Sequence, residues 1–374
     1  MQIVITGADG FVGRNLRLRL AEIGHHAVTS IVRGSTAAEL ATAIAGADLV
    51  VHLAGVNRPQ DPAEFAAGNA GFTTALCRLL EASGRQVPVI FSSSTQAALD
   101  NPYGRSKLAA EEALLSYATA TASPVHIFRL TNVFGKWSRP NYNSAVATFC
   151  HNIARGLPIA VSDPAAPLRL VYVDDVIDAF LGVLAQGGEG TATGGGFCEA
   201  GPVYATTVGE VADSIRAFAG ARETLLIPPV GTGLARALHA TYVSFLPPAS
   251  FAYQVPRHID PRGEFVEMLR TSDSGQFSYF TAHPGITRGG HYHHSKTEKF
   301  LVIRGTARFG FRHVESGEVC DLTVRGGEGS VVETAPGWAH DVTNVGDDEL
   351  LVMLWANELF DRNRPDTIAM KVDG

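Results

Sequence analysis

The hydrophobic pattern of this 374-residue chain changes character near residue 250. Before that point, short apolar runs such as Ile3–Thr6, Leu49–Leu53, Val87–Ser92 and Val125–Leu130 alternate with Ala-rich segments in which leucines have helical spacing. This alternation predicts βαβ units, which build a parallel sheet covered by helices on both faces.

After Gln254 the apolar segments become short and alternating, and they are rich in Gly, Phe, Thr and Val. Regularly spaced short strands with Gly-rich turns predict a β-sandwich or a β-barrel. A chain of this length is long for one hydrophobic core. We therefore predict two domains, 1–245 and 252–374, with a linker within Tyr242–Pro256. The expected C-terminal strands are Gln276–Thr281, Lys299–Ile303, Thr306–Phe311, Gly329–Glu333 and Leu350–Trp355.

Composition narrows the class of protein. A net charge of −7 without a block of like charges gives no indication of nucleic acid or an anionic membrane as a partner. Four cysteines without a C-x-x-C pair favour a reducing compartment. No apolar run approaches the length that spans a bilayer, and the N-terminus runs directly into an expected strand. We expect a soluble cytoplasmic protein.

Three glycines follow the first expected strand with the spacing G-x-x-G-x-x-G, at Gly7, Gly10 and Gly13. Glycine allows a tight turn and lets the backbone approach a pyrophosphate, and the helix N-terminus that follows attracts its negative charge. A glycine trio alone is found in many turns. Its place at the first strand–helix junction favours dinucleotide binding, with Phe11 and Val12 as further contacts.

The second expected strand, Ala27–Val32, ends at Arg33 rather than at an acidic residue. An Asp or Glu there would bond the ribose hydroxyls of NAD, whereas Arg suits the additional phosphate of NADP. We therefore predict NADPH as the cofactor, with Arg33 as a contact of that phosphate. The alternative is a solvated surface arginine.

Tyr103 and Lys107 are four residues apart at the start of an expected helix, so their side chains face the same way. A nearby ammonium favours the tyrosinate, and the phenol can then exchange a proton with a sugar alcohol or ketone near neutral pH. The run Ser92–Ser94 ends an expected strand and offers a hydroxyl to a carbonyl oxygen. Taken separately, a Tyr–Lys pair or a serine run is more often surface or turn chemistry.

Together these segments resemble the extended short-chain dehydrogenase/reductase family over about the first 240 residues. The shared pattern also includes His52–Gly55 and Arg129–Gly135, in the family's order. The resemblance implies an α/β fold with a Rossmann-type doubly wound parallel sheet. It also implies cofactor contacts from three residues after the third strand, namely Leu53, Ala54 and Gly55.

The same resemblance implies catalytic roles for Tyr103 and Lys107, which would also contact the cofactor. It favours Ser94 as the third catalytic residue, with Ser93 as the competing assignment.

Later segments of the family match Asn141–Ser144 and Tyr172–Asp175. Such regions line or support the nucleotide-sugar site in relatives, which makes Asn132, Asn143 and Arg169 the candidate substrate contacts. Asp174 and Asp175 are more readily explained as helix-capping residues.

His291 and His293 are two apart on an expected strand, so both imidazoles lie on one face, and His294 points to the other. Glu298 follows within reach of one hairpin turn, and His340 ends the segment Pro336-Gly337-Trp338-Ala339-His340. Three imidazoles and a carboxylate form a ligand set that suits Zn, Ni, Fe or Mn.

This pattern resembles the cupin superfamily over about residues 255–355. The resemblance implies an all-β barrel that holds a divalent metal, with zinc as the first candidate, on His291, His293, Glu298 and His340. The second motif departs from the usual P-x-G-x-x-H because Pro336 directly precedes Gly337, which leaves the geometry of that turn open.

A narrower resemblance is to cupin epimerases that act on nucleotide-linked 4-keto sugars, over Asp260–Phe265 and Gly285–Tyr292. In those metal-free enzymes, the histidine that matches His291 removes a proton next to the ketone. A nitrogen bound to metal cannot also take a proton, so we assign His291 to the metal and leave the base open. A metal beside the C4 ketone would act as a Lewis acid and stabilise the enolate.

The fusion of these two parts, with Asp100–Gly104 and Pro140–Ser144, resembles bifunctional capsular-polysaccharide enzymes over nearly the whole chain. This resemblance implies a homodimer and a UDP-linked 4-keto amino sugar, UDP-2-acetamido-2,6-dideoxy-β-L-arabino-hex-4-ulose, as the substrate. The cupin would epimerise C3 and the NADPH-dependent reductase would reduce C4, which gives UDP-2-acetamido-2,6-dideoxy-L-talose on the route to UDP-N-acetyl-L-fucosamine. The alternatives are a 4-ketoreductase with a structural cupin and a non-enzymatic NADP-sensing protein.

Overall fold

The computed structural model describes residues 1–188, 196–260, 263–266, 268–269, 271, 275–358 and 363–373. The chain forms two compact units, each from two segments. The first comprises Met1–Val133 and Arg169–Ala205, and the second comprises Phe134–Leu168 and Thr206–Gly374. The boundary expected near residue 250 separates a part with alternating strands and helices from a part made of strands. The compact units divide the chain differently, because the second unit contains several helices as well as the C-terminal strands.

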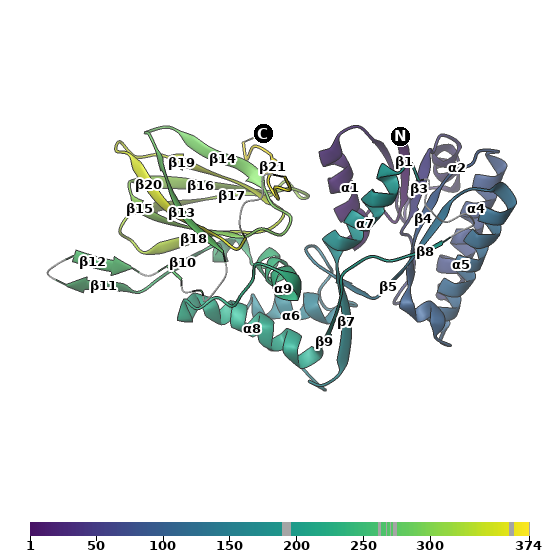
Figure 1. Ribbon diagram of the computed structural model, residues 1–374, viewed down its shortest axis with the longest axis horizontal. Coiled ribbons are helices and arrows are strands. Elements are labelled where there is room, and N and C mark those ends of the chain that lie inside the picture. Colours follow the sequence, from purple (N-terminus) through teal and green to yellow (C-terminus); the bar gives the residue numbers. More distant parts are fainter. Residues whose placement is uncertain are drawn as a thin grey trace. The chain divides into compact units, whose positions relative to one another are not determined.

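Within the described residues, the first unit holds a six-stranded parallel sheet in the order β2-β1-β3-β4-β5-β8 (Figure 1). The strands are β1 (Gln2–Thr6), β2 (Ala27–Ile31), β3 (Leu49–His52), β4 (Val89–Ser94), β5 (Val125–Leu130) and β8 (Gly196–Cys198). The strand order reverses between β1 and β3. In open α/β sheets, ligands bind beyond the carboxyl ends of the strands at such a reversal.

Helices cover both faces of this sheet (Figure 1). Helix α1 (Phe11–Ile23) contacts α7 (Val173–Ala185) on one face, and α4 (Phe72–Ala82) contacts α2 (Ala37–Ala45) and α5 (Pro102–Thr121) on the other. Apolar residues from these helices and from the strands form a buried core, which includes Val50, Leu76, Phe91, Leu114 and Tyr117. The predicted Rossmann-type parallel sheet is therefore confirmed.

The second unit holds two five-stranded antiparallel sheets, in the orders β10-β18-β15-β20-β13 and β17-β16-β19-β14-β21 among the described residues (Figure 1). Phe300 and Phe309 come from different sheets and pack with ring centroids 5.6 Å apart, so the sheets share one core. The predicted all-β cupin fold is confirmed. The strands are β10 (Ala252–Gln254), β13 (Gln276–Ala282), β14 (Thr287–Tyr292), β15 (Glu298–Arg304), β16 (Thr306–His313), β17 (Val319–Arg325), β18 (Ser330–Thr334), β19 (Trp338–Asn344), β20 (Leu350–Ala356) and β21 (Ile368–Ala369).

Further elements among the described residues include the helices α6, α8 and α9, a small sheet and a hairpin. Helix α8 contacts both α6 and α9, and the small sheet has the order β6-β7-β9. Two residues of the epimerase-like segment 260–265, Pro261 and Arg262, lie outside the described residues. The elements are α6 (Ala145–Ile153), α8 (Val208–Thr224), α9 (Gly233–Ser244), β6 (Asn132–Phe134), β7 (Pro167–Tyr172), β9 (Val203–Thr207), β11 (Arg257–Asp260) and β12 (Gly263–Val266).

The segment that we expected to act as a linker, Tyr242–Pro256, is built into the second unit instead. Helix α9 runs to Ser244, and β10 pairs antiparallel with β18. Phe251 is fully buried, where its ring meets those of Phe311 and Trp338. The prolines end a helix and shape a turn here, because proline cannot continue either a helix or a strand ladder.

Candidate active sites

The glycine loop and the end of β3 meet at the carboxyl edge of the parallel sheet. Gly7 has a φ of +67°, and a Cβ on it would lie 2.7 Å from the backbone nitrogen of Ala54. A Cβ on Gly13 would lie 2.4 Å from the Gly7 oxygen. Both positions therefore require glycine. Gly7 thus packs against Leu53 and Ala54. The other predicted cofactor contacts are their neighbours in sequence, namely Gly10, Phe11, Val12 and Gly13 in the glycine loop and Gly55 after β3.

Arg33 lies two residues beyond the end of β2 and is exposed. The backbone nitrogen of Ala8, in the glycine loop, donates to the oxygen of Ile31 at 3.3 Å. The end of β2 therefore lies beside the glycine loop, and Arg33 is available at the same sheet edge as the predicted cofactor contacts.

Helix α5 begins with tight local packing that positions Tyr103. The Oδ1 atom of Asn101 accepts from the backbone nitrogen of Gly104 at 2.8 Å, and Pro102 occupies the first turn. These are favoured residues for a helix start. A Cβ on Gly104 would lie 2.3 Å from the oxygen of Gln96, so the helix start packs directly against the 3₁₀ turn that follows β4.

Ser93 and Ser94 have different partners, although they are neighbours on β4. The Ser94 side chain acts on the phenol of Tyr103, whose pKa it lowers, and its Oγ accepts from the backbone nitrogen of Gln96 at 3.2 Å. Ser93 is buried and donates to Oε1 of Glu111 at 2.5 Å, and Glu111 also pairs with Arg129. The structure thus brings Ser94, and not Ser93, to the phenol of Tyr103.

Lys107 is buried and donates from Nζ to the backbone oxygen of Ser92 at 2.9 Å. Burial lowers the pKa of Lys107 to about 8, although Glu111 raises it. Burial also raises the pKa of Tyr103, against the effect of the Ser94 hydrogen bond. Burial of the phenol thus acts against the tyrosinate that the Tyr–Lys spacing predicts. A protonated phenol is the form that can donate a proton to a ketone.

Asn69 is a buried residue at this site that the sequence reasoning missed. It lies in a π-helical turn, Ala66–Gly71, which follows the short helix α3 (Ala63–Phe65). Its Oδ1 accepts from the nitrogen of Val56 at 2.8 Å, and its Nδ2 donates to Oγ of Ser106 at 2.9 Å. Single π-turns inside helices are frequent at functional sites. The local sequence fits a regular helix, so no pattern indicated this turn.

The predicted substrate contacts fall into two groups. Asn132 and Arg169 are exposed, and Nδ2 of Asn132 donates to the backbone oxygen of Arg169 at 3.1 Å. Asn143 is exposed in the second unit, directly before Ser144, which caps helix α6.

Asp174 and Asp175 lie in the first turn of α7, whose N-cap is Tyr172. The expected capping role is therefore wrong. The two carboxylates instead lie where the helix dipole favours negative charge.

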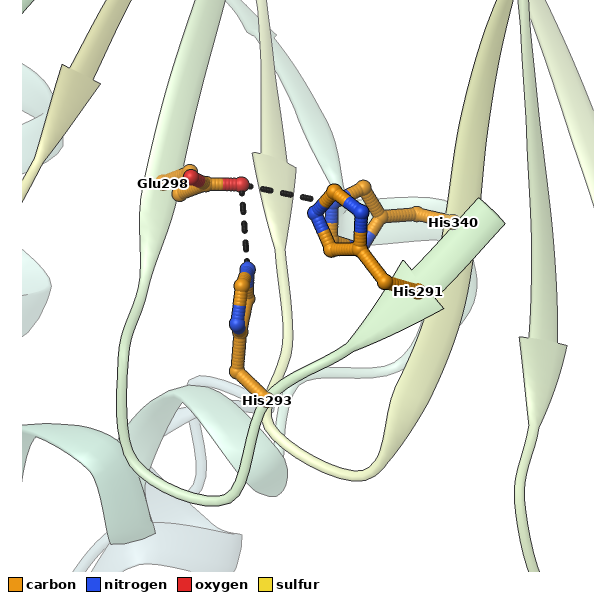
Figure 2. Close-up of side chains that lie close together, drawn as sticks. All are labelled: His291, His293, Glu298 and His340. Atoms are coloured by element: carbon orange, nitrogen blue, oxygen red, sulfur yellow. Dashed lines mark hydrogen bonds and ion pairs between the residues drawn. The ribbon is translucent and has the colours of Figure 1, made fainter. Parts of the chain in front are cut away.

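The second unit gathers the four predicted metal ligands into one cluster (Figure 2). One candidate ligand atom from each of His291, His293, Glu298 and His340 lies within 4.8 Å of the others. His291 and His340 are register partners on β14 and β19, and Glu298 is the first residue of β15. Within the described part of the chain, His294 does not belong to the cluster, as expected, although β14 ends at Tyr292 and both His293 and His294 follow the strand.

The protonation states of the residues in this cluster favour the binding of a cation. The Nε2 atoms of His293 and His340 each lie 3.2 Å from Oε2 of Glu298. Burial, together with His340 and His293, lowers the pKa of His291 to about 3, and burial also lowers that of His340. Although burial opposes ionisation, the adjacent His293 and His340 side chains hold the pKa of Glu298 well below its usual range. Neutral imidazoles and an ionised carboxylate are the forms that bind metal.

The donor set fits a divalent transition metal. Three imidazoles and one carboxylate are common ligands of zinc. Neither ring nitrogen of the buried His340 makes a hydrogen bond of good geometry with any residue that the structure describes. Buried polar atoms normally have partners, so this ring is consistent with a place for an ion.

The turn before His340 is compatible with its unusual Pro-Gly order. Gly337 has a φ of +80°, and its nitrogen donates to the backbone oxygen of His293 at 2.9 Å. The glycine thus takes the left-handed conformation one position after Pro336, and the turn is tied to the strand end that carries His293.

Comparisons with known proteins agree with both halves of the chain. The model of the NAD dependent epimerase/dehydratase family matches residues 3–193, and that of the polysaccharide biosynthesis C-terminal domain matches residues 258–368. The chain belongs to the NAD dependent epimerase/dehydratase family, in a form that carries a C-terminal cupin. It is an enzyme of the reductase/epimerase class.

Two relatives are similar to this chain along its whole length. A curated protein of Pseudomonas aeruginosa, UDP-2-acetamido-2,6-beta-L-arabino-hexul-4-ose reductase, is 54% identical over 100% of this chain and 99% of its own. The crystal structure of the capsular polysaccharide assembling protein CapF from Staphylococcus aureus is 40% identical, covers 100% of both chains and has a TM-score of 0.68. The resemblance to bifunctional capsular-polysaccharide enzymes is confirmed as a resemblance to CapF.

A third structure matches the fold alone. The Bordetella bronchiseptica enzyme WbmF in complex with NAD+ is 22% identical over 59% of this chain and 78% of its own, with a TM-score of 0.52. In the described residues, the helices are all too short or too polar to cross a membrane.

Proposed function

We propose that the chain catalyses two successive reactions on UDP-2-acetamido-2,6-dideoxy-β-L-arabino-hex-4-ulose. The cupin epimerises C3, and the reductase then reduces C4 with NADPH to give UDP-2-acetamido-2,6-dideoxy-L-talose. The observation that carries this proposal is similarity along the whole chain to a reductase of such a sugar and to CapF. The same chain also holds a candidate reductase site and a candidate metal cluster. The product would serve as a precursor of UDP-N-acetyl-L-fucosamine for capsular or O-antigen polysaccharide.

In the reductase step, NADPH supplies a hydride to C4 of the ketone. The Tyr103 hydroxyl donates its proton to the carbonyl oxygen, so the ketone becomes an alcohol without a free alkoxide. Ser94, whose side chain acts on the Tyr103 phenol, would hold that same oxygen. The ammonium of Lys107, which is buried, would supply positive charge to the nucleotide and the phenol.

In the cupin step, the C4 ketone makes the C3–H bond acidic, and C3 loses a proton and regains one on the opposite face. A divalent metal held by His291, His293, Glu298 and His340 would supply Lewis-acid stabilisation of the enolate. The base at C3 has no assigned residue in this proposal.

NADPH, zinc, a homodimer and a cytoplasmic site of action belong to the same proposal. Exposed Arg33 at the end of β2 supports NADPH, because its guanidinium can bind the 2′-phosphate. The predicted domains 1–245 and 252–374 would correspond to the reductase and the epimerase.

The division of labour is tested with two variants in deuterated water. Tyr103→Phe is expected to lower kcat for NADPH oxidation by about 10²–10⁴-fold, because the proton donor is lost. Solvent exchange at C3, followed by proton NMR, should remain. His340→Ala is expected to lose metal and C3 exchange while it still binds NADPH. Equal loss of both activities in two folded variants would contradict the proposal, and C3 exchange by metal-free protein would contradict the metal's role.

A further inference from the structure

The loop between two of the candidate metal ligands, residues 294–297, is held by a residue about seventy positions further along the chain. The carboxylate of Asp366 accepts three backbone hydrogen bonds from this loop. The donors are the nitrogens of His294 at 2.8 Å, Ser295 at 2.7 Å and Lys296 at 2.8 Å. The Ser295 hydroxyl donates to the same carboxylate at 3.1 Å. Hydrogen bonds to an ionised acceptor are stronger than neutral ones, so this contact restrains the loop firmly.

Asp366 also contacts the ring of a candidate metal ligand. Its backbone oxygen accepts a hydrogen bond from Nδ1 of His293. A proton on Nδ1 leaves Nε2 as the free nitrogen, and Nε2 is the atom that faces Oε2 of Glu298 at 3.2 Å. Partners of this kind fix the tautomer and the orientation of a metal-binding histidine.

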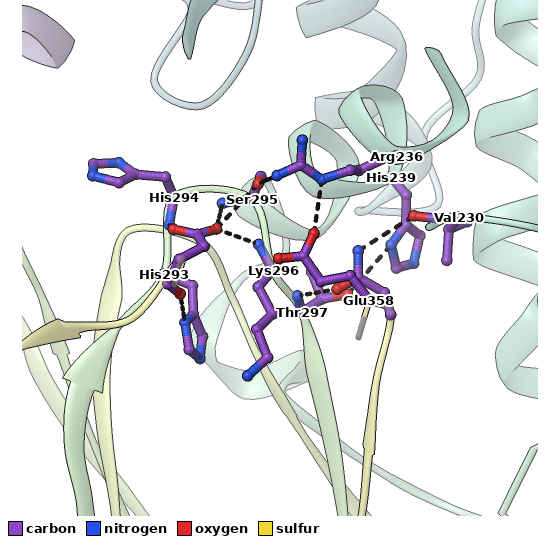
Figure 3. A network of polar contacts seen from close by, with 11 residues as sticks. Val230, Arg236, His239, His293, His294, Ser295, Lys296, Thr297 and Glu358 are labelled. Atoms are coloured by element: carbon purple, nitrogen blue, oxygen red, sulfur yellow. Dashed lines mark hydrogen bonds and ion pairs between the residues drawn. The ribbon is translucent and has the colours of Figure 1, made fainter. Parts of the chain in front are cut away.

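Other partners fasten the loop without touching a ligand ring (Figure 3). Arg236 of α9 donates to the Ser295 hydroxyl and, through Nε, to Glu358 at 2.9 Å. The backbone nitrogen of Thr297 donates to Oδ1 of Asn357 at 2.8 Å. These contacts restrain the loop only. Asp366 both restrains the loop through its carboxylate and bonds the His293 ring through its backbone oxygen.

We infer that Asp366 is a positioning residue for the metal centre: its carboxylate holds the loop, and its backbone oxygen presents Nε2 of His293 to the ion. The inference rests on the proposed function of the cupin as a metal site. Replacing an outer partner of a metal-binding histidine typically weakens metal affinity by about 10–100-fold.

The test compares Asp366→Asn with Asp373→Asn in the full chain. Asp373 lies in the same C-terminal segment, but it is exposed and pairs with Arg308 at 3.4 Å. Competition with a chromophoric chelator would measure Zn²⁺ affinity. We expect Asp366→Asn to bind Zn²⁺ about 10–100-fold more weakly. Asp373→Asn should match the wild type. The visible spectrum of the Co²⁺-loaded protein should change in Asp366→Asn, which a loss of stability alone would not cause.

A second measurement needs no variant, in case Asp366→Asn fails to fold. With ¹¹³Cd²⁺ bound to ¹⁵N-labelled wild type, the cadmium should couple to Nε2 of His293, and Nδ1 should carry a proton. Coupling to Nδ1 would overturn the inference. Wild-type affinity and an unchanged Co²⁺ spectrum in Asp366→Asn would also overturn it. A wild-type chain that binds none of these ions would overturn the proposed metal centre itself, and the inference with it.

Discussion

Ser93 and Ser94 illustrate how the environment of a residue, rather than its type, decides its chemistry. Both hydroxyls end the same strand, and the family resemblance left them as competing assignments. In the structure, Ser93 is buried and donates to Glu111, whereas the Ser94 side chain acts on the phenol of Tyr103. Both partners lie on helix α5 (Pro102–Thr121), with Tyr103 in its first turn and Glu111 further along the helix. Side chains alternate along β4, so the two neighbouring hydroxyls point in different directions and meet different residues.

We therefore expect Ser94→Ala and Ser93→Ala to differ in their effects on catalysis and on stability. Ser94→Ala should lower kcat for ketone reduction by about 10²-fold, because it removes a donor to the developing charge on the carbonyl oxygen. Ser93→Ala should keep kcat near that of the wild type and lose about 1–3 kcal/mol of stability, since it leaves buried Glu111 short of a donor. Steady-state kinetics and urea unfolding measure the two effects. A catalytic loss in Ser93→Ala alone would reverse the assignment.

Residue types and spacing predicted which four residues gather in the metal cluster, but they did not predict the ionisation of the candidate site residues. The four members of the metal cluster follow from strand period and hairpin reach, and they do lie together. The protonated state of Tyr103 depends on how deeply the helix start packs, which no spacing shows. Asn69 and Asp366 act through partners 13 and about 70 residues away, and such distant contacts leave no local pattern.

At the scale of elements, a buried ion network joins helix α8 to strands β15 and β18 in the second unit. Glu333 accepts from both Lys299 and Arg222, and Lys299 also donates to the Tyr253 hydroxyl at 3.2 Å. Lys299 and Glu333 are polar residues that a strand pattern places on the solvent face. Both are buried here, because helices and loops cover that face.

Removal of Glu333 should therefore be costly. Glu333→Gln leaves two cations without their carboxylate, and we expect a loss of about 3–5 kcal/mol in the free energy of unfolding. The matched control is Glu349→Gln, which breaks an exposed pair with Arg304 and should cost less than about 1 kcal/mol. All three tryptophans lie in the second unit, so tryptophan fluorescence during urea unfolding reports this unit. Equal losses in the two variants would contradict the role of burial.

The same network predicts a pH dependence of stability. Although burial opposes its ionisation, Lys299 and Arg222 lower the pKa of Glu333 from 4.5 to about 2. A carboxyl with a depressed pKa in the folded state contributes stability above its unfolded pKa. That contribution is lost as the pH falls from about 4.5 to about 2. The acid slope of stability over this window should be shallower in Glu333→Gln than in the wild type.

At the scale of the whole molecule, the two kinds of hydrophobic pattern predicted two folds in one chain, and both are present. Parallel strands that are buried on both faces read as continuous apolar runs between helical segments, whereas short antiparallel strands alternate apolar and polar residues, so sequence alone separates them. The grouping of 134–168 and 206–250 with the C-terminal strands was not predictable in this way. These segments have ordinary helical patterns, and their grouping depends on contacts far apart in sequence, such as that of Arg222 with Glu333.

The central claim is that the C4 carbonyl first permits epimerisation at C3 in the cupin and is then reduced in the reductase domain. The positions of deuterium and hydrogen in the product test this claim most directly. The wild-type enzyme would be incubated with the UDP-linked 4-keto sugar and NADPH in deuterated water, and the product analysed by proton NMR. The account predicts deuterium at C3, from exchange beside the ketone, and ordinary hydrogen at C4, from NADPH. A reduced product that keeps its original hydrogen at C3 would contradict it.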